Sequence, residues 1–201
     1  MRLDRKAIEQ QARGWWLSLQ PSKDGRYPGD RAALARLRRA SHTVEAAAEP
    51  ATLDLYGRLA LLPKDARESQ IAEALGRVAV LAAVLAHVTD DTRVLLGRAL
   101  GPTQAKAPES AVLKPLRLAR LLAARGDADI HTAFRRAIAL LGGTANVGEL
   151  AWLVLVWDHP DMGDRVRTLF AFAYHDASAH APAESHETET TDPSVGATPS
   201  T

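Results

Sequence analysis

The chain has 201 residues and a formal net charge of +1, and 46% of its residues are hydrophobic but only 5% aromatic. It contains no cysteine, which excludes disulfides and thiolate metal sites and fits a reducing cytoplasm. The N-terminus lacks the apolar core of a signal peptide, and the longest apolar run, 78–86, is too short to cross a bilayer. We therefore expect a cytoplasmic protein without a membrane partner.

The first half of the chain is predicted to be helical, because Ala and Leu recur at helical spacing and β-branched residues are sparse. We expect helices over residues 4–19, 30–40, 50–62 and 65–88. A short helix around 95–100 follows, with Asp90 or Asp91 as its cap. Gly101 and Pro102 end it.

The second half resumes after a loop over 102–108, the predicted boundary between two bundles. We expect a helix over 112–124, and another that Asp127 or Asp129 caps and that ends at Gly142–Gly143. An almost wholly apolar helix over 146–158 and a last helix after 159–161 complete the series. The pattern predicts an all-α fold of about nine helices in two small helical bundles, 1–101 and 109–178.

The last residues, 179–201, differ from the rest of the chain. They contain four acids, no Lys or Arg, and little apolar bulk beyond Ala and Pro. Such a segment cannot bury enough surface to offset the entropy of ordering, so we expect a disordered acidic tail. Without these acids the body of the chain is modestly basic, which permits a nucleic-acid partner without requiring one.

The residues of common catalytic sites do not form their characteristic patterns here. Seven histidines include no HExxH pair, and the chain has no P-loop, GxSxG or GxGxxG motif. The paired acids lie at expected helix starts, where capping explains them better than catalysis does. We therefore expect a protein that is not an enzyme, with no cofactor and no metal site.

The segment 29–41, GDRAALARLRRAS, predicts a helix with two contrasting sides. At about 100° per residue, Ala33, Leu34 and Leu37 share one side. The opposite arc carries Arg31, Arg36, Arg38 and Arg39, with no acid after Asp30. An ordinary amphipathic surface helix would explain this pattern, but a merely solvated face usually mixes charge signs.

A second set of basic residues favours a phosphate-binding surface. Lys114, Arg117 and Arg120 step by three residues along one helix face, and no acid lies between Lys114 and Arg125. Arg98, Arg135 and Arg136 add to the set. Guanidinium groups bind phosphate bidentately, whereas base recognition would need polar readers such as Asn or Gln, which these helices lack. The sequence thus predicts binding to nucleic-acid backbone that is independent of base sequence.

The aromatic residues are predicted to pack rather than to stack on bases. Because Trp15 and Trp16 are adjacent, their side chains point about 100° apart, and we expect one in the core and the other at a bundle edge or interface. Strongly apolar helices carry the remaining candidates for the core, Trp152, Trp157, Phe170 and Phe172.

Several segments together resemble the CasB family, the small subunit of the type I-E CRISPR surveillance complex known as Cascade. They are Trp15–Trp16, GDRAALARLRRA at 29–40, LGRAL at 96–100, LKPLRLARLLAARGDADIHTAFRRAIALL at 113–141 and LAWLVLVWDHPDMGDRVRTLFAFAY at 150–174. Their order is that of the family, and the similarity spans most of residues 10–176. The acidic tail departs from the family pattern.

The resemblance implies an all-helical, non-catalytic subunit. It implies two copies in a complex built on CRISPR RNA, along the backbone subunits and in contact with the large subunit. The family role is to help hold the R-loop, including the displaced non-target DNA strand, in antiviral defence. The residues that it implies as nucleic-acid ligands are Arg31, Arg36, Arg38, Arg39, Arg98, Lys114, Arg117, Arg120, Arg135 and Arg136.

Two other functions stay open from the sequence. A helical scaffold could use the same arginines to contact acidic protein surfaces, without touching nucleic acid. A hydrolase without a recognisable motif is the third hypothesis, and none of the seven histidines gives it a starting point.

Overall fold

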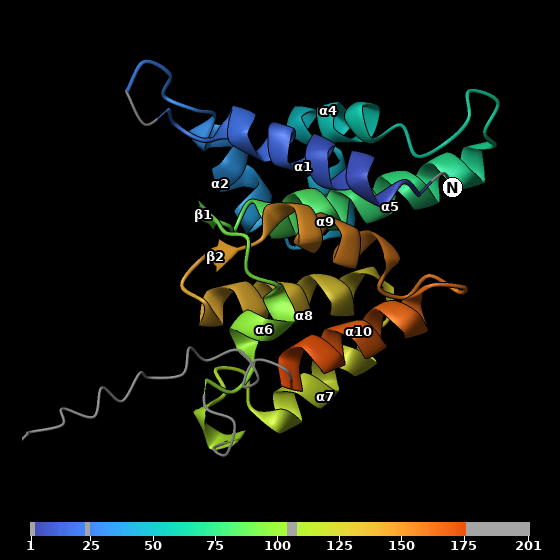
Figure 1. Ribbon diagram of the computed structural model, residues 1–201. Coiled ribbons are helices and arrows are strands. Elements are labelled where there is room, and N and C mark those ends of the chain that lie inside the picture. The colour runs from blue at the N-terminus through green and yellow to red at the C-terminus, as the bar shows by residue number, and fades with distance from the viewer. Residues whose placement is uncertain (1–2, 23–24, 104–107, 176–201) are drawn as a thin grey trace, which may run out of the picture.

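The computed structural model describes residues 3–22, 25–103 and 108–175, and these form an all-α fold. Figure 1 shows the helices packed in stacked layers. The α-helices are α1 (Arg5–Leu19), α2 (Arg31–Arg39), α3 (Thr43–Ala47), α4 (Pro50–Leu59), α5 (Glu68–Leu85), α6 (Leu96–Leu100), α7 (Pro115–Ala123), α8 (Gly126–Leu140), α9 (Val147–Val156) and α10 (Gly163–His175). The predicted all-α class is confirmed.

Small elements account for most departures from the prediction. Helix α3 is an additional five-residue helix without a side-chain cap, so no local signal marks it. A 3₁₀ turn spans Pro108–Ser110. Strands β1 (Asp90–Asp91) and β2 (Thr144–Ala145) form one short parallel pair. Their pairing depends on residues more than fifty positions apart, which alternation within one segment does not reveal.

The acids predicted as helix caps have other roles. Asp91 lies in β1, where it accepts hydrogen bonds from the N–H of Val147 (3.0 Å) and from Arg13 Nε (2.7 Å). It therefore supports the start of α9 rather than that of α6. Helix α8 begins one residue before Asp127, and its N-cap residue, Arg125, makes no side-chain cap. The predicted caps of α6 and α8 are wrong, whereas Gly142 and Gly143 do end α8 with positive φ.

The core is built around α9, which is almost wholly buried, and the C-terminal half of α5. Helix α1 packs between α4 and α9, and α5 contacts both α8 and α9. These contacts join segments on either side of the loop at 102–108. The loop lies partly outside the described residues and the predicted acidic tail lies wholly outside them, and the predicted division at this loop stays a prediction. Among the helices in the described part of the chain, none has the length and apolarity that a bilayer crossing requires.

Both adjacent tryptophans are buried, so the prediction that one would lie at an edge is wrong. Trp15 donates its indole N–H to the carbonyl of Ala51 (2.8 Å), and Trp16 donates to that of Val88 (3.1 Å). Two sides of α1 can be apolar because α4 and α9 cover it on different sides. Phe172, predicted in the core, is 68% exposed on α10.

A half-buried ionic contact holds α5 against the start of α8 and the end of α9. Nη2 of Arg77 lies 2.8 Å from an oxygen of Asp158 and 3.2 Å from one of Asp127. Asp158 also accepts the N–H of Gly126 (2.9 Å). Burial alone would raise the pKa of Asp158, but the Gly126 hydrogen bond and the Arg77 charge outweigh it and lower the pKa.

Replacing Arg77 with methionine should therefore lower the free energy of unfolding by about 2 kcal/mol, because it leaves two carboxylates without their cation. Urea denaturation of the full chain measures the change. The control is Arg58→Met, which removes an exposed pair with Asp54 and should cost less than about 0.5 kcal/mol. Equal losses in the two variants would contradict this role of Arg77.

Candidate nucleic-acid interface

Helix α2 carries the first predicted arginine set. Gly29, at φ +70°, leads into it where any Cβ would lie 2.6 Å from the carbonyl oxygen of Leu19. Asp30 caps the helix by accepting the N–H of Ala33 (2.8 Å). The buried side consists of Ala33, Leu34 and Leu37, and the exposed set is Arg31, Arg36, Arg38 and Arg39. The predicted apolar and cationic sides are confirmed, whereas a phosphate-binding role stays a prediction.

The arginines of α2 do not all have the same surroundings. Arg36 pairs with Glu49 just before α4, at 2.8 Å between Nε and Oε2, and this hydrogen bond raises the Arg36 pKa. Arg38 instead donates Nε–H to the carbonyl of Ala86 (2.5 Å), at the end of α5. Arg36 is thus partly neutralised on one side of α2, and Arg38 reaches toward α5 on the other.

Two half-buried histidines, His87 and His131, lie close to Arg135 of α8, and His87 lies close to Arg38 as well. The pKa of His87 is lowered to about 4, chiefly by burial and then by the charges of Arg135, His131 and Arg38. Burial and then Arg135 also lower the pKa of His131. The Nε2 atoms of both imidazoles are buried and have no hydrogen-bond partner. No local motif contains these two residues, so sequence reasoning did not single them out. The packing of α5 against α8 brings them together.

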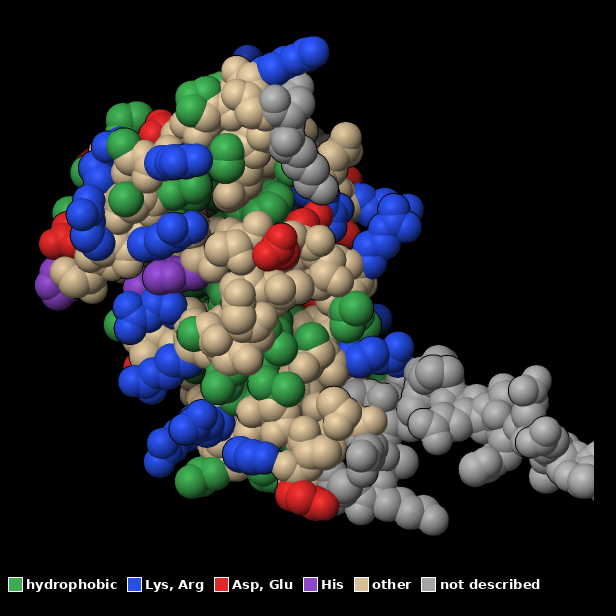
Figure 2. Space-filling view, turned by 90° about the vertical axis from the view of Figure 1, so that its left-hand side faces the viewer, with side chains coloured by type: hydrophobic (Ala, Val, Ile, Leu, Met, Phe, Trp, Pro, Cys, Tyr) green, Lys and Arg blue, Asp and Glu red, His purple; other side chains and the backbone are tan. Residues whose placement is uncertain are grey.

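Helix α8 connects the two arginine sets through adjacent residues that face different neighbours. The charge of Arg135 lowers the pKa of both histidines. Arg136 instead lines a groove between α7 and α8 together with Arg117 and Arg120. Neighbouring positions on a helix point about 100° apart, which explains the division. Figure 2 shows Lys and Arg side chains in a row along one edge of this face, with histidine among them. We call Arg38, Arg117, Arg120, Arg135 and Arg136 the basic band.

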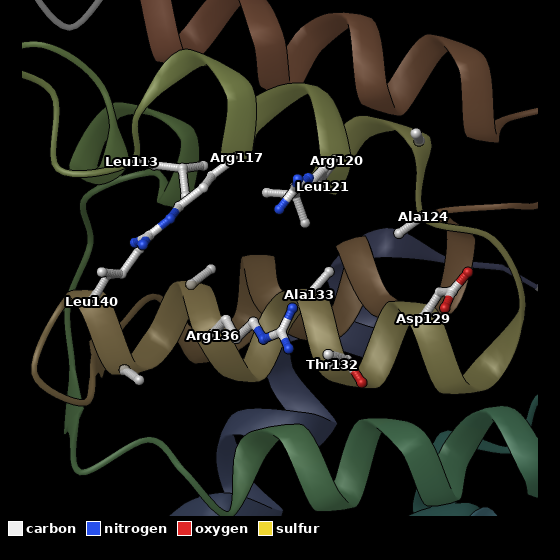
Figure 3. A pocket seen from close by; sticks show the side chains of 13 residues that line it. Leu113, Arg117, Arg120, Leu121, Ala124, Asp129, Thr132, Ala133, Arg136 and Leu140 are labelled. Atoms are coloured by element: carbon white, nitrogen blue, oxygen red, sulfur yellow. The ribbon is translucent and has the colours of Figure 1, made fainter. Parts of the chain in front are cut away.

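The groove between α7 and α8 has a volume of about 770 Å³. Its apolar lining includes Leu113, Leu121 and Ala133. Figure 3 shows Arg117 and Arg120 on the α7 wall and Arg136 on the α8 wall, with Asp129 toward the end where Ala124 lies. The groove can therefore hold an extended anionic chain, with cations on both walls, an apolar floor and its one acid at the Ala124 end.

The remaining predicted ligands are less available. Lys114 donates Nζ–H to the carbonyl of Glu109 (2.5 Å), and Arg98 is half-buried on α6, which packs against α10. Arg31 and Arg39 are exposed on α2 and form no ion pair within the described residues.

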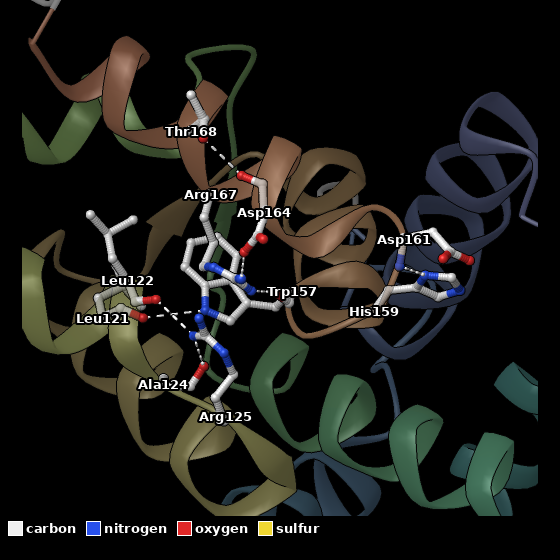
Figure 4. Close-up of polar contacts among 10 residues, drawn as sticks. All are labelled: Leu121, Leu122, Ala124, Arg125, Trp157, His159, Asp161, Asp164, Arg167 and Thr168. Carbon is white, nitrogen blue, oxygen red and sulfur yellow. Dashed lines mark hydrogen bonds and ion pairs between the residues drawn. The ribbon is translucent and has the colours of Figure 1, made fainter.

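Two further arginines have local structural roles (Figure 4). Arg125 donates to the carbonyls of Leu122 (2.8 Å) and Ala124 (2.9 Å) and so supports the turn after α7. Arg167 donates to the carbonyl of Trp157 and pairs with Asp164. Neither side chain belongs to the basic band.

Acids and histidines do not gather into a metal site in the described residues, where no group of three or more could hold an ion. No curated protein and no solved structure gives a significant match to the chain. A family model described as CRISPR-associated protein Cse2 (CRISPR_cse2) matches residues 33–175, and this span contains the whole basic band. The match covers well over half of the 201 residues and confirms the CasB resemblance: the chain belongs to the Cse2 family of CRISPR-associated proteins.

Proposed function

We propose that this Cascade subunit binds nucleic-acid backbone along its basic band and thereby stabilises the R-loop, with the displaced DNA strand as the ligand. The observation that carries the proposal is the convergence of two arginine sets, far apart in the sequence, on one face of the molecule. The charges of Arg38 and Arg135 both lower the pKa of His87, so the two arginines lie near the same side chain. Arg136, next to Arg135, lines the groove together with Arg117 and Arg120. The role is non-catalytic.

The chemistry of the band suits phosphate better than bases. Guanidinium groups stay charged and bind phosphate oxygens bidentately, and the groove walls offer no Asn or Gln to read base edges. R-loop formation is nearly balanced in energy, because the RNA–DNA hybrid replaces a duplex of similar stability. A cationic groove that holds the displaced strand can therefore shift the balance through a few phosphate contacts.

The double variant Arg120→Glu/Arg136→Glu tests this function in the assembled complex, where R-loop formation on target DNA is measured by gel shift. We expect roughly tenfold weaker binding at fixed low salt, because two cations on opposite groove walls become anions. The slope of log affinity against log salt should fall by about 1.4, since each single-strand phosphate contact contributes about 0.7.

The matched control is Lys6→Glu/Lys64→Glu, which makes the same charge change at exposed positions on α1 and after α4. It should leave affinity and salt slope within about twofold of the parent. Unchanged binding by the groove variant would contradict the proposal. Loss of incorporation into the complex, with DNA binding by the free chain intact, would instead support the protein-scaffold alternative.

Partner contacts of Cascade itself belong to other surfaces in this proposal. Leu169 and Phe172 are 54% and 68% exposed on α10, and Leu116 is 67% exposed on α7. Exposed apolar side chains of this size are typical of protein contacts. We propose that such positions serve the other Cascade subunits or a second copy of the chain, while CRISPR RNA and DNA meet the basic band.

A further inference from the structure

The groove between α7 and α8 contains unneutralised positive charge. Elsewhere in the described residues, arginines such as Arg5, Arg58 and Arg77 have carboxylate partners within 4 Å. Arg117, Arg120 and Arg136 have no carboxylate partner within 4 Å among the described residues, although all three line one groove. An anionic occupant would be stabilised by charge-assisted hydrogen bonds to them.

The two ends of this groove differ in charge. Figure 3 shows Arg117 near Leu113 and Leu140, while the acid Asp129 lies near Ala124 at the opposite end. Leu113 therefore marks the end of the groove where an anionic segment would enter most favourably.

The C-terminal end of the described chain is fixed at this same end. The buried hydroxyl of Tyr174 donates to the carbonyl of Leu113 at 2.6 Å, and α10 ends one residue later at His175. This hydrogen bond places the point from which residues 176–201 continue beside the arginine end of the groove.

The sequence that follows His175 complements the groove in charge. Residues 176–201 contain no Lys or Arg, and their acids are Asp176, Glu184, Glu187, Glu189 and Asp192. An extended chain spans about 3.3–3.6 Å per residue, so Glu184 can lie up to roughly 30 Å from His175. Helix α7 is only about 14 Å long at 1.5 Å per residue. The acids can therefore reach every arginine of the groove.

We infer that the acidic segment 184–192 docks into the α7–α8 groove of its own chain. Its carboxylates would take the places on Arg117, Arg120 and Arg136 that phosphates take in the proposed function. Most of the residues between the acids are small, Ser185, Thr188, Thr190 and Thr191, and suit a groove with an apolar floor. If the proposed function holds, the tail is a built-in competitor that suppresses binding to unspecific nucleic acid.

Tethering makes weak docking sufficient. A linked segment acts at an effective concentration of the order of 1 mM, so even a millimolar intrinsic affinity would occupy the groove about half of the time. A nucleic-acid strand that contacts the whole basic band can still displace it, because the strand gains contacts with Arg38 and Arg135 that the segment need not make.

Docking can be measured without nucleic acid, because the chain has no cysteine and accepts a single spin label at Ser185→Cys. NMR of the full isotope-labelled chain at low salt should show selective broadening of the amides of Arg117, Arg120 and Arg136. The variant Glu184→Gln/Glu187→Gln/Glu189→Gln/Asp192→Asn should lose this broadening. Four neutral changes in the same segment, Thr188→Gln/Thr190→Gln/Thr191→Gln/Ser194→Asn, should keep it.

Absence of selective broadening in the folded full chain would overturn the inference. Broadening that appears only when spin-labelled and isotope-labelled chains are mixed would also overturn it, since the occupant would then be a second copy. Broadening that survives 0.5 M NaCl and tail neutralisation would contradict the charge-based docking.

Competition is tested with a 20-nucleotide single-stranded DNA probe and the full chain. Neutralising the four acids should strengthen binding about twofold or more at low salt, because the docked segment occupies the groove about half of the time, and the difference should vanish at high salt. If the spin label reports docking but neither chain binds the probe, the proposed function fails while the docking stands. If both chains bind with equal affinity, the tail does not compete, and that part of the inference is wrong.

Discussion

Replacing Trp157 with alanine should lower the free energy of unfolding by about 4 kcal/mol. Trp157 is fully buried at the end of α9. Its indole makes edge-to-face contacts with Phe134 of α8 at 4.9 Å and Phe170 of α10 at 5.3 Å between ring centroids. Its N–H donates to the carbonyl of Leu121 on α7 at 3.2 Å (Figure 4). One side chain thus links four helices.

Thermal unfolding followed by circular dichroism measures this effect. For a chain of this length, about 4 kcal/mol corresponds to a Tm decrease of roughly 8–16 °C. Trp157→Phe should retain much of the aromatic packing and lose the bond to Leu121, at a cost of about 1–2 kcal/mol. Trp152→Ala is the control, because Trp152 is only half-buried and lies under Arg5 at 5.9 Å.

A loss for Trp157→Ala no larger than that for Trp152→Ala would contradict the central role of Trp157. The result also bears on the groove. Leu121, the hydrogen-bond partner of Trp157, lines the groove between α7 and α8. Weakened attachment of α7 should reduce DNA binding at temperatures well below Tm, even though Trp157 is buried away from the ligand.

Burial could be predicted from the sequence where it depends only on the periodicity of a single helix. Ala33, Leu34 and Leu37 of α2 could be assigned to the core, because the apolar side of a helix follows from its periodicity. Trp16 could not, since its burial depends on a contact with Val88, 72 positions away. Phe172 shows the opposite error: its helix is apolar enough to suggest the core, but α10 leaves this side chain exposed.

The candidate site divides in the same way. The arginine-rich faces are visible in the sequence, but their joining is not, because only tertiary packing places Arg38 and Arg135 around His87. The pairing of Arg36 with Glu49 was equally unpredictable. Composition identifies which side chains can bind phosphate, whereas packing determines which of them remain available to do so.

Glu149 should make the stability of the protein fall as pH rises from 5 to 8. The side chain lies on α9 and is 8% exposed, and its Oε2 accepts the N–H of Leu96 at 2.6 Å. Burial raises its pKa to about 7 from a reference of 4.5, against the opposing effects of the Leu96 hydrogen bond and the Arg5 charge. The folded chain therefore holds this proton more tightly than the unfolded chain.

The direction of this pH dependence follows from proton linkage. Below pH 4.5 both states are protonated and the full stability is present; between 4.5 and 7 only the unfolded state ionises, so stability decreases. Relative to Glu149→Gln, which removes the titration and can still accept the Leu96 hydrogen bond, the parent should lose about 2 kcal/mol between pH 5 and pH 8. Urea denaturation at several pH values measures the difference between the two chains.

Comparing two chains also removes an opposing contribution. His87 has a folded pKa of about 4 against 6.5, so it makes stability fall as pH drops from 6.5 toward 4. Because both chains contain His87, its effect cancels in their difference. Glu73→Gln, which neutralises an exposed carboxylate on α5, should give a difference from the parent that changes little over this pH range. If the difference in unfolding free energy between Glu149→Gln and the parent also changed little with pH, the Glu149 carboxyl would ionise in the folded chain as easily as in the unfolded one. That result would contradict the prediction.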